Sequence, residues 1–113
     1  MTQNNNKPIH GIRYYDEEKT KKYYEYWILN GEHHREDGPA VIGYRKDGSI
    51  WYEYYFLNGK QHREDGPAFI KYYTDGSIWY EYYNLNGCNY SKEEYLKLIP
   101  PQNRIKVLIN DAE

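Results

Sequence analysis

The sequence predicts a mainly β fold, an antiparallel meander of tandem 28-residue hairpin repeats that ends in a short C-terminal helix. Three observations lead to this prediction. Shifting the sequence by 28 residues superposes residues 23–50 on residues 51–78 with 19 of 28 positions identical, which is typical of repeat architectures. Asn-Gly and Asp-Gly pairs, which tight hairpin turns favour, recur at fixed positions of the repeat. Sixteen of the 113 residues are tyrosines, and aromatic residues are enriched in strands.

The repeats divide a chain whose length corresponds to one small domain, residues 1–113. Because terminal units cap the open ends of a repeat stack, we expect incomplete units on both sides of the two full ones. The expected parts are an N-terminal tail at 1–11, a half repeat at 12–22, full repeats at 23–50 and 51–78, a partial repeat at 79–90, and a C-terminal helix and cap at 91–113.

The first strand of the array is expected at residues 12–15, where Ile-Arg-Tyr-Tyr parallels residues 70–73. In the first full repeat, a strand at residues 40–44 leads into Asp47-Gly48, where glycine supplies the positive φ that a hairpin turn requires. The longest extended segment follows at residues 49–57. The same order recurs 28 residues later, at 68–72, 75–76 and 77–85.

A second turn follows each extended segment. Asn58-Gly59 is a strong hairpin signal that returns the backbone into a brief third strand at residues 61–63. Gly66-Pro67 ends that strand, because proline donates no hydrogen bond to a ladder and restricts the residue before it. We therefore expect a loop that resets the register for the next repeat. The equivalent turns are Asn30-Gly31 and Asn86-Gly87.

The segment after residue 90 changes to a helical pattern. Ser91 and Glu94 form a capping box, and the apolar residues that follow are spaced for one side of a short helix. The prolines at 100–101 are expected to end it. Over residues 103–109, apolar and polar residues alternate in a way that favours a strand, with a second helical turn as the alternative because Leu108 breaks the alternation.

The repeated residues resemble a known family. Tyr-Glu-x-Tyr, Asn-Gly-Lys-x-His and Asp-Gly are similar to the MORN-type β-hairpin repeats, over residues 12–87. The longer string at residues 57–68, Leu-Asn-Gly-Lys-x-His-Arg-Glu-Asp-Gly-Pro-Ala, resembles a variant that is common in uncharacterised phage, giant-virus and bacterial proteins. This resemblance implies a virus- or phage-encoded inhibitor or adaptor that acts on a host protein, with a nuclease or another defence protein as the target.

The tetrapeptide His-Arg-Glu-Asp is a candidate for acid–base chemistry, since imidazole and carboxylate can form an acid–base pair. A catalytic site is assembled once, from distant parts of a chain, whereas this tetrapeptide occurs in both full repeats. We therefore predict no enzyme and no catalytic residues. Instead we expect a structural turn motif, in which Arg pairs with a carboxylate, Asp caps the turn and His packs on tyrosines. Its residues are His34, Arg35, Glu36, Asp37, His62, Arg63, Glu64 and Asp65.

Histidine is also a common metal ligand, and repeats can stack His33, His34 and His62 from successive units. A stable site needs further ligands and groups that orient them. The single Cys88 excludes a cysteine-rich zinc site. We expect no bound metal and no cofactor.

The aromatic residues form rows. Side chains alternate between the two faces of a strand, so Trp51, Glu53 and Tyr55 are expected to share a face with the matching residues of the neighbouring units. The glutamate indicates that this face is partly hydrated, and Tyr and Trp dominate protein-recognition surfaces. The alternative is that these rings build the core of a sheet with few aliphatic residues. The predicted partner-binding residues are Tyr23, Trp27, Trp51, Tyr55, Trp79 and Tyr83.

Composition limits the class of partner. Fifteen Lys and Arg against 17 Asp and Glu give a formal charge of −2, so the chain lacks the basic excess of a general nucleic-acid binder. The polar N-terminus does not resemble a signal peptide, and no apolar run approaches the ~20 residues of a membrane helix. We therefore expect a cytoplasmic protein without membrane contact, located in the host cytoplasm if it is viral.

Together these features predict a non-enzymatic, protein-binding module whose partner is a host protein. The alternative is a carbohydrate-binding domain in which Trp51, Trp79 and Tyr83 are stacking platforms. Exposed edge strands would also allow a homodimer, because their backbone groups are free to pair with another strand.

Overall fold

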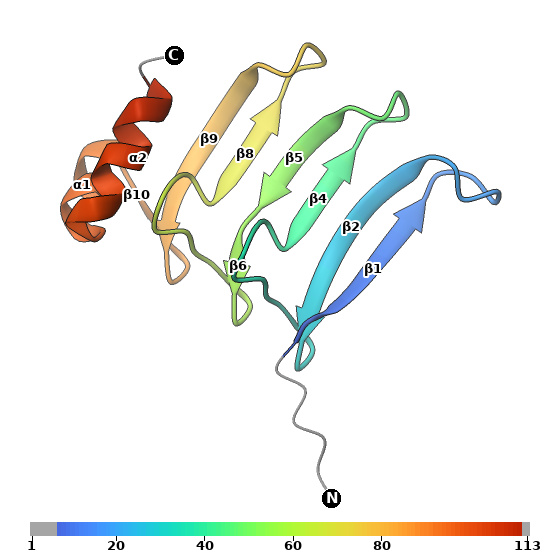
Figure 1. Ribbon diagram of the computed structural model, residues 1–113, viewed down its shortest axis with the longest axis horizontal. Helices are drawn as coiled ribbons and strands as arrows, with labels where there is room; N and C mark the ends of the chain where they lie inside the picture. Colours follow the sequence, from blue (N-terminus) through green and yellow to red (C-terminus); the bar gives the residue numbers. More distant parts are fainter. Residues whose placement is uncertain (1–6, 112–113) are drawn as a thin grey trace, which may run out of the picture.

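The computed structural model describes residues 7–111, which form a mainly β fold with two C-terminal helices (Figure 1). The strands are β1 (Ile9–Tyr14), β2 (Lys22–Leu29), β3 (Glu32–His33), β4 (Val41–Tyr44), β5 (Ile50–Tyr54), β6 (Phe56–Leu57), β7 (Lys60–Gln61), β8 (Phe69–Tyr72), β9 (Ile78–Leu85) and β10 (Cys88–Tyr90). The helices are α1 (Lys92–Leu98) and α2 (Pro101–Asp111).

All strand pairings are antiparallel, which confirms the predicted antiparallel sheet. The eight-stranded sheet has the order β1-β2-β4-β5-β8-β9-β10, with β3 paired to β2, and β6 and β7 form a separate ladder. β1 begins at Ile9, inside the segment expected to be a tail. The third strands are short, because β3 and β7 end before His34 and His62.

The glycine-containing turns have the predicted backbone conformation. Asn58 and Gly59 have φ angles of 51° and 78°, and the other two Asn-Gly pairs have similar values. Both residues of such a turn need positive φ, which matches the right-handed twist of the strands that it joins. The Asp-Gly turns are stabilised by a side chain. At Asp47-Gly48, the backbone N–H of Ser49 (2.9 Å) and its hydroxyl (2.6 Å) both donate to Asp47 Oδ1.

We expect Gly59→Val to destabilise the protein by at least about 1 kcal/mol, because a β-branched residue resists positive φ. A side chain at this position would also meet the carboxylate of Glu32, which lies beside the site of an added Cβ. Urea unfolding measures the loss. Gly59→Asn is the matched control, since Asn58 already adopts this conformation, and an unchanged midpoint for the valine variant would contradict the assigned turn.

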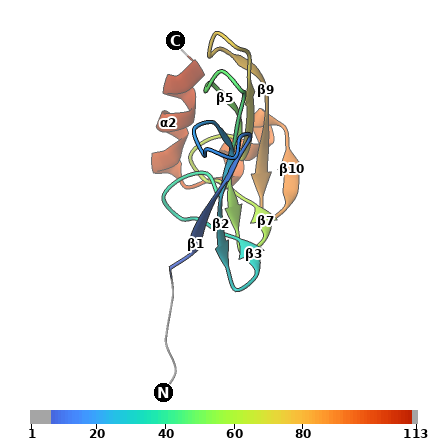
Figure 2. The ribbon, with the colours of Figure 1, turned by 90° about the vertical axis from the view of Figure 1, so that its right-hand side faces the viewer.

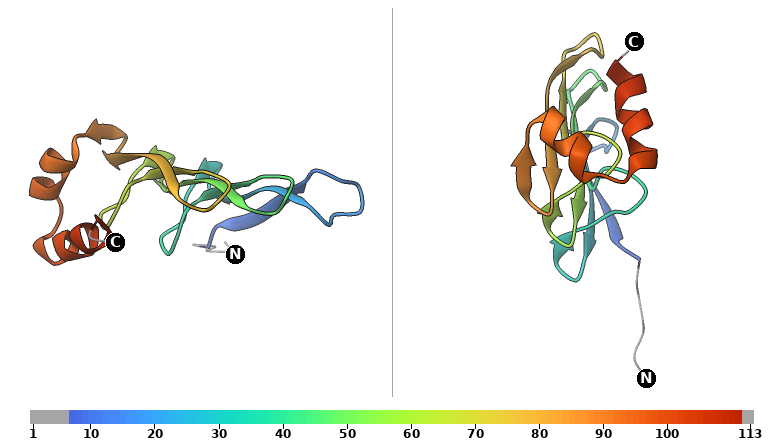
Figure 3. Two further views of the ribbon diagram at one scale, coloured as in Figure 1. Left: turned by 90° about the horizontal axis from the view of Figure 1, so that it is seen from above. Right: turned by 90° about the vertical axis from the view of Figure 1, so that its left-hand side faces the viewer.

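The sheet is a single layer with two different faces, and the molecule is only 20 Å thick along its shortest axis. On one face, which we call the helix face, α2 lies beside the last strands (Figures 2 and 3). We call the opposite face the aromatic face. Residues that pair directly across neighbouring strands point to the same face of the sheet. One such row belongs to the helix face and consists of Ile12, Glu25, Ile42, Glu53, Ile70 and Glu81.

Two parallel rows of ladder partners define the aromatic face. Tyrosine or phenylalanine occupies four of the six positions in the first row and three of the six in the second, and smaller or basic residues fill the rest. The first row is Gly11, Tyr26, Val41, Tyr54, Phe69 and Tyr82. The second is Arg13, Tyr24, Gly43, Tyr52, Lys71 and Tyr80.

The main cluster of buried apolar residues lies at one end of the sheet. Tyr83 of β9 packs against Tyr95 of α1, against Ile99 directly after this helix, and against Val107 of α2. Tyr95 and Val107 are almost completely buried. The helices therefore supply the apolar layer that this end of a single-layer sheet lacks.

The structure confirms the capping box at Ser91 and Glu94, and α1 ends before Pro100 as predicted. The predicted strand at 103–109 is wrong, because these residues belong to α2. Pro101 is the first residue of this helix, where its fixed φ is favourable and its missing N–H costs nothing. A strand would place Ile105 and Val107 on one face, but Ile105 is 63% exposed and Val107 only 2%.

Candidate interaction surface

The His-Arg-Glu-Asp loops join neighbouring hairpins, and histidine makes the connection. His34 Nδ1 accepts a hydrogen bond from the backbone N–H of Asn58 at 2.9 Å, and its Nε2 lies 3.5 Å from Glu36. Since Nδ1 accepts, the proton of the neutral ring is on Nε2 and points to the carboxylate. His62 repeats this arrangement with Asn86 and Glu64. The expectation that these histidines pack on tyrosines is therefore replaced by a bond to the next Asn-Gly turn.

The arginines of the loops cover aromatic rings of the helix face. Arg35 Nε donates to Asp37 at 2.9 Å and its Nη1 donates to the carbonyl oxygen of Pro39 at 3.1 Å. Its guanidinium carbon lies 3.8 Å from the ring centroid of Trp27. The predicted Arg–carboxylate pair is present, but the aspartate accepts from arginine instead of capping the turn. In the second loop, Arg63 likewise donates to Asp65 and to the carbonyl oxygen of Pro67, and its guanidinium lies over the ring of Tyr55.

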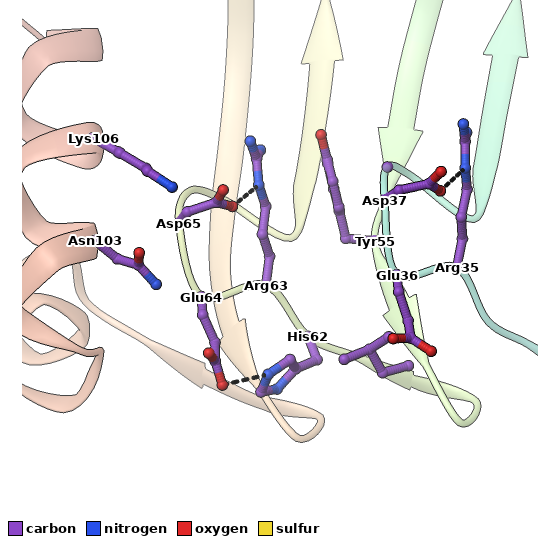
Figure 4. A pocket seen from close by; sticks show the side chains of 12 residues that line it. Arg35, Glu36, Asp37, Tyr55, His62, Arg63, Glu64, Asp65, Asn103 and Lys106 are labelled. Atoms are coloured by element: carbon purple, nitrogen blue, oxygen red, sulfur yellow. Dashed lines mark hydrogen bonds and ion pairs between the residues drawn. The ribbon is translucent and has the colours of Figure 1, made fainter.

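Between the two loops and α2 lies a groove of about 510 Å³ on the helix face (Figure 4). Lys106 and Asn103 of α2 border it on one side, and the carboxylates of the loops border it on the other. Asp37 and Glu36 are more than four-fifths exposed. The imidazoles contact both a carboxylate of their own loop and the next Asn-Gly turn, and the guanidiniums contact their own loop and a strand aromatic ring. These contacts support the structural interpretation of this motif over an acid–base one.

Within residues 7–111, no group of three or more His, Cys, Asp or Glu side chains is arranged to hold a metal ion. His34 and His62 use their ring nitrogens for the contacts between hairpins. His33 instead lies beside the ring of Phe56, at 5.3 Å between centroids.

The glutamates of the helix face accept hydrogen bonds from tyrosines. Glu25 accepts from the Tyr44 hydroxyl and from Lys22 Nζ (3.0 Å), and it lies 2.8 Å from His10 Nε2. Burial alone would raise the pKa of Glu25, but these hydrogen bonds and the positive charge of Lys22 outweigh it and lower the pKa to about 2. The carboxyl is only 10% exposed, so it does not mark a hydrated face as the sequence suggested.

The same pairing recurs along the sheet with one change at its end. The Tyr72 hydroxyl donates to Glu53 at 2.6 Å, and burial together with this bond raises the pKa of Tyr72. Tyr44 and Tyr72 each lie 19 residues after their glutamate. Glu81 has no such tyrosine, since residue 100 is proline, and accepts instead from Tyr83 at 3.3 Å.

The six predicted partner-binding residues separate into two groups of three. On the helix face, Trp27 lies between the His10 ring at 4.3 Å and the Arg35 guanidinium at 3.8 Å. Tyr55 lies under Arg63, and Tyr83 is 7% exposed in the cluster with the helices. These three rings are covered by residues of the chain itself.

Trp79 lies at a β-bulge that turns its ring toward the aromatic face. Lys71 pairs with Tyr80, but Tyr72 pairs with Ile78, so Trp79 has no partner in the ladder. A bulge re-aims side chains, and the ring of Trp79 lies 4.6 Å from the ammonium of Lys71, a residue of the aromatic face. The same register shift occurs beside Tyr23 and Trp51.

The rings of the aromatic face are connected, and those contributed by β9 are the most exposed, whereas Phe69 between them and Tyr54 is 6% exposed. Centroid distances are 4.3 Å between Tyr54 and Phe69, 5.7 Å between Phe69 and Tyr82, and 5.7 Å between Tyr52 and Tyr54. The exposed fractions are 50% for Trp79 and 48% for Tyr82. Within residues 7–111, helix α2 lies on the other side of the sheet (Figure 2).

No family model matches the sequence, and no curated protein or solved structure shows significant similarity to it. The function must therefore be argued from the surface itself. In the described part of the chain, no helix has both the length and the apolar composition that crossing a membrane requires.

Sequence reasoning missed most residues of the aromatic face as a site. The prediction assumed that side chains alternate strictly between the two faces of each strand, and it therefore assigned the binding surface to the face that carries the glutamates. Trp51 and Tyr52 are both aromatic, so a register shift between them leaves no break in the hydrophobic pattern. The exposed tyrosines of β9, Tyr80 and Tyr82, could have been found by weighing the opposite face equally.

Among the strands of residues 7–111, β1 is at the edge of the sheet and pairs on one side, with β2 (Figure 1). The backbone N–H of Trp27 donates to Ala40 and its carbonyl accepts from His34, so the β2 residues on either side of it point toward β1. The alternate β1 residues His10 and Ile12 therefore point their backbone groups outward. An edge of this kind can pair with another strand, and the homodimer stays a prediction that sedimentation equilibrium would test.

Proposed function

We propose that this chain is a non-enzymatic protein-binding module whose binding surface is the aromatic face. The observation that supports the proposal is the connected set of rings, in which Trp79 is 50% exposed and Tyr82 48%. Tyr and Trp combine an apolar ring with a polar group at a small entropy cost, and they are enriched at the energetic centres of interfaces. An extended ring surface favours a protein partner over a small molecule, which a concave pocket would bind.

We further propose that the sheet is a tandem array of the MORN-like type, encoded by a virus or phage to inhibit or recruit a host protein. The contacts between hairpins support the array. The bonds from Asn58 to His34 and from Asn86 to His62 are both 2.9 Å and span the same number of residues. The proposed origin and host target rest on the resemblance of the sequence alone.

We expect Trp51→Ala and Trp79→Ala each to weaken partner binding by about 2 kcal/mol or more, a loss of about 30-fold in affinity, while the protein stays folded. The immobilised protein would first retain its partner from a host lysate, and titration with the purified partner would then give the dissociation constants. Folded variants with parental affinity would overturn the proposal.

Trp27→Phe is the control, because it keeps a ring beneath Arg35 on the helix face and should leave affinity unchanged. Addition of soluble oligosaccharides tests the alternative function. A carbohydrate-binding face would lose its partner to the added sugar, whereas an extended protein interface would retain it.

A further inference from the structure

Lys71 is the one position of the second aromatic row where the two full repeats differ. The first repeat has Gly43 there. The ring of Tyr52 lies directly over this glycine, so that an added Cβ would overlap the ring. Glycine thus allows the ring to lie across the neighbouring strand. The second repeat has Lys71 at the equivalent position, so the row of rings contains a charged side chain there.

The ammonium of Lys71 is surrounded by rings. It lies 4.6 Å from the ring centroid of Trp79, 5.3 Å from Trp51 and 5.7 Å from Tyr80. Within the described residues 7–111, no carboxylate forms an ion pair with it. Lys71 is partly exposed, so its charge is held in place by cation–π contacts and remains accessible to a partner.

Charge is divided between the two faces of the sheet. All four acidic residues of the strands lie on the helix face, namely Glu25, Glu53, Glu81 and, by its pairing with Leu29, Glu32. The strand residues that bring charge to the aromatic face are basic, Arg13 and Lys71. The guanidinium of Arg45 adds to this charge, 5.9 Å from the Trp51 ring.

We propose that the group formed by Trp51, Lys71, Trp79 and Tyr80, the Lys71 site, binds a glutamate or aspartate side chain in an acidic segment of the partner protein. This inference rests on the proposed function and adds the chemistry of the partner to it. The carboxylate pairs with the lysine ammonium, and apolar residues on either side of the acid contact the rings. The complementarity of charge, and the absence of competing acidic residues on the strands of this face, support that occupant.

A nucleic acid is the less favoured occupant. Each nucleotide brings a phosphate, and binding a single strand takes a positively charged groove along its whole path. The aromatic face offers three basic groups, and the whole chain has a formal charge of −2. A short acidic segment needs only one or two of these charges.

The test uses a blocked peptide, Gly-Leu-Glu-Leu-Glu-Leu-Gly, its Glu-to-Gln analogue and an eight-residue deoxythymidine strand as probes. The indole N–H signals of Trp51 and Trp79 report binding in NMR titrations, and Trp27 on the helix face is the internal reference. We expect the Glu peptide to move the first two signals and to bind at least about fivefold tighter than the Gln analogue. Raising NaCl from about 50 mM to about 500 mM should weaken it, because this contact is largely electrostatic.

Two variants separate charge from packing. Lys71→Met should lose at least about fivefold in affinity for the Glu peptide, and Lys71→Arg should stay close to the parent, since arginine keeps the charge among the rings. Lys97→Met, on the exposed surface of α1, is the control for general charge.

Equal binding of the Glu and Gln peptides, unchanged binding by Lys71→Met, or no binding of the Glu peptide would each overturn the inference. Tighter binding of the deoxythymidine strand than of the Glu peptide would overturn it in favour of a nucleic acid. The proposed function fails separately, if folded Trp51→Ala and Trp79→Ala variants bind the lysate partner at parental affinity.

Discussion

Tyr95→Ala is expected to destabilise the protein by about 4 kcal/mol, in the range for removing a large buried ring. Tyr95 is 0% exposed, and the centroid of its ring lies 4.7 Å from that of the Tyr83 ring. Its hydroxyl donates to the carbonyl oxygen of Arg63, lies 2.9 Å from that of Gly66 and accepts from the Gly66 N–H at 3.2 Å. One side chain therefore joins the helices both to the last long strand and to the second His-Arg-Glu-Asp loop.

Tyr95→Phe separates these two contributions, because it keeps the ring and removes the hydroxyl. It should cost about 1–3 kcal/mol, since the buried N–H of Gly66 loses its acceptor. Burial raises the pKa of Tyr95 to about 12, so the hydroxyl stays protonated and can donate at neutral pH. Urea unfolding monitored by circular dichroism gives both values, and an alanine variant as stable as the parent would show that the helices are not needed for the sheet.

Glu25 is expected to make the folded protein up to about 3 kcal/mol more stable at neutral pH than at pH 2. Its pKa is lowered from the ordinary 4.5 to about 2 in the folded protein. Between these values the unfolded chain binds the proton and the folded one does not, so stability rises with pH. The contribution is complete above about pH 4.5 and is lost as the pH falls toward 2.

Urea unfolding of the parent and of Glu25→Gln at a series of pH values between about 2 and 6 measures this contribution. The difference between the two proteins isolates Glu25, because the other carboxylates titrate in both. Glu93→Gln, on an exposed residue of α1, is the control. If the difference between parent and Glu25→Gln is the same at every pH, the Glu25 network does not stabilise the carboxylate.

The turns and strands could be predicted because their signals are local. A positive φ at Gly59 is encoded by the Asn-Gly pair itself, and the capping box at Ser91 lies within four residues. These features depend on backbone geometry, so no knowledge of distant residues was needed. The antiparallel order follows from the short connections between successive strands.

The errors concern features that depend on partners far along the chain. Glu25 is satisfied by Tyr44, 19 residues away, so its charge did not mean a hydrated surface. The C-terminal segment is short and apolar, and periodicity alone does not separate a strand from a helix there. The side of this segment that is buried is the one that carries Val107, which packs against Tyr83 and Tyr95.

The position of the apolar cluster also determines the order in which the strands of the sheet unfold. The cluster of Tyr83, Tyr95, Ile99 and Val107 joins β9 to the helices. Among the strands that the structure describes, β1 pairs with β2 alone. Amide protons of β9 should therefore exchange with solvent only when the whole protein unfolds, and those of β1 through local fraying at a much lower free energy. Pulling or heating would separate the strands in sequence order, beginning with the first hairpin, so that the part of the ring surface around Lys71 is the last to be lost.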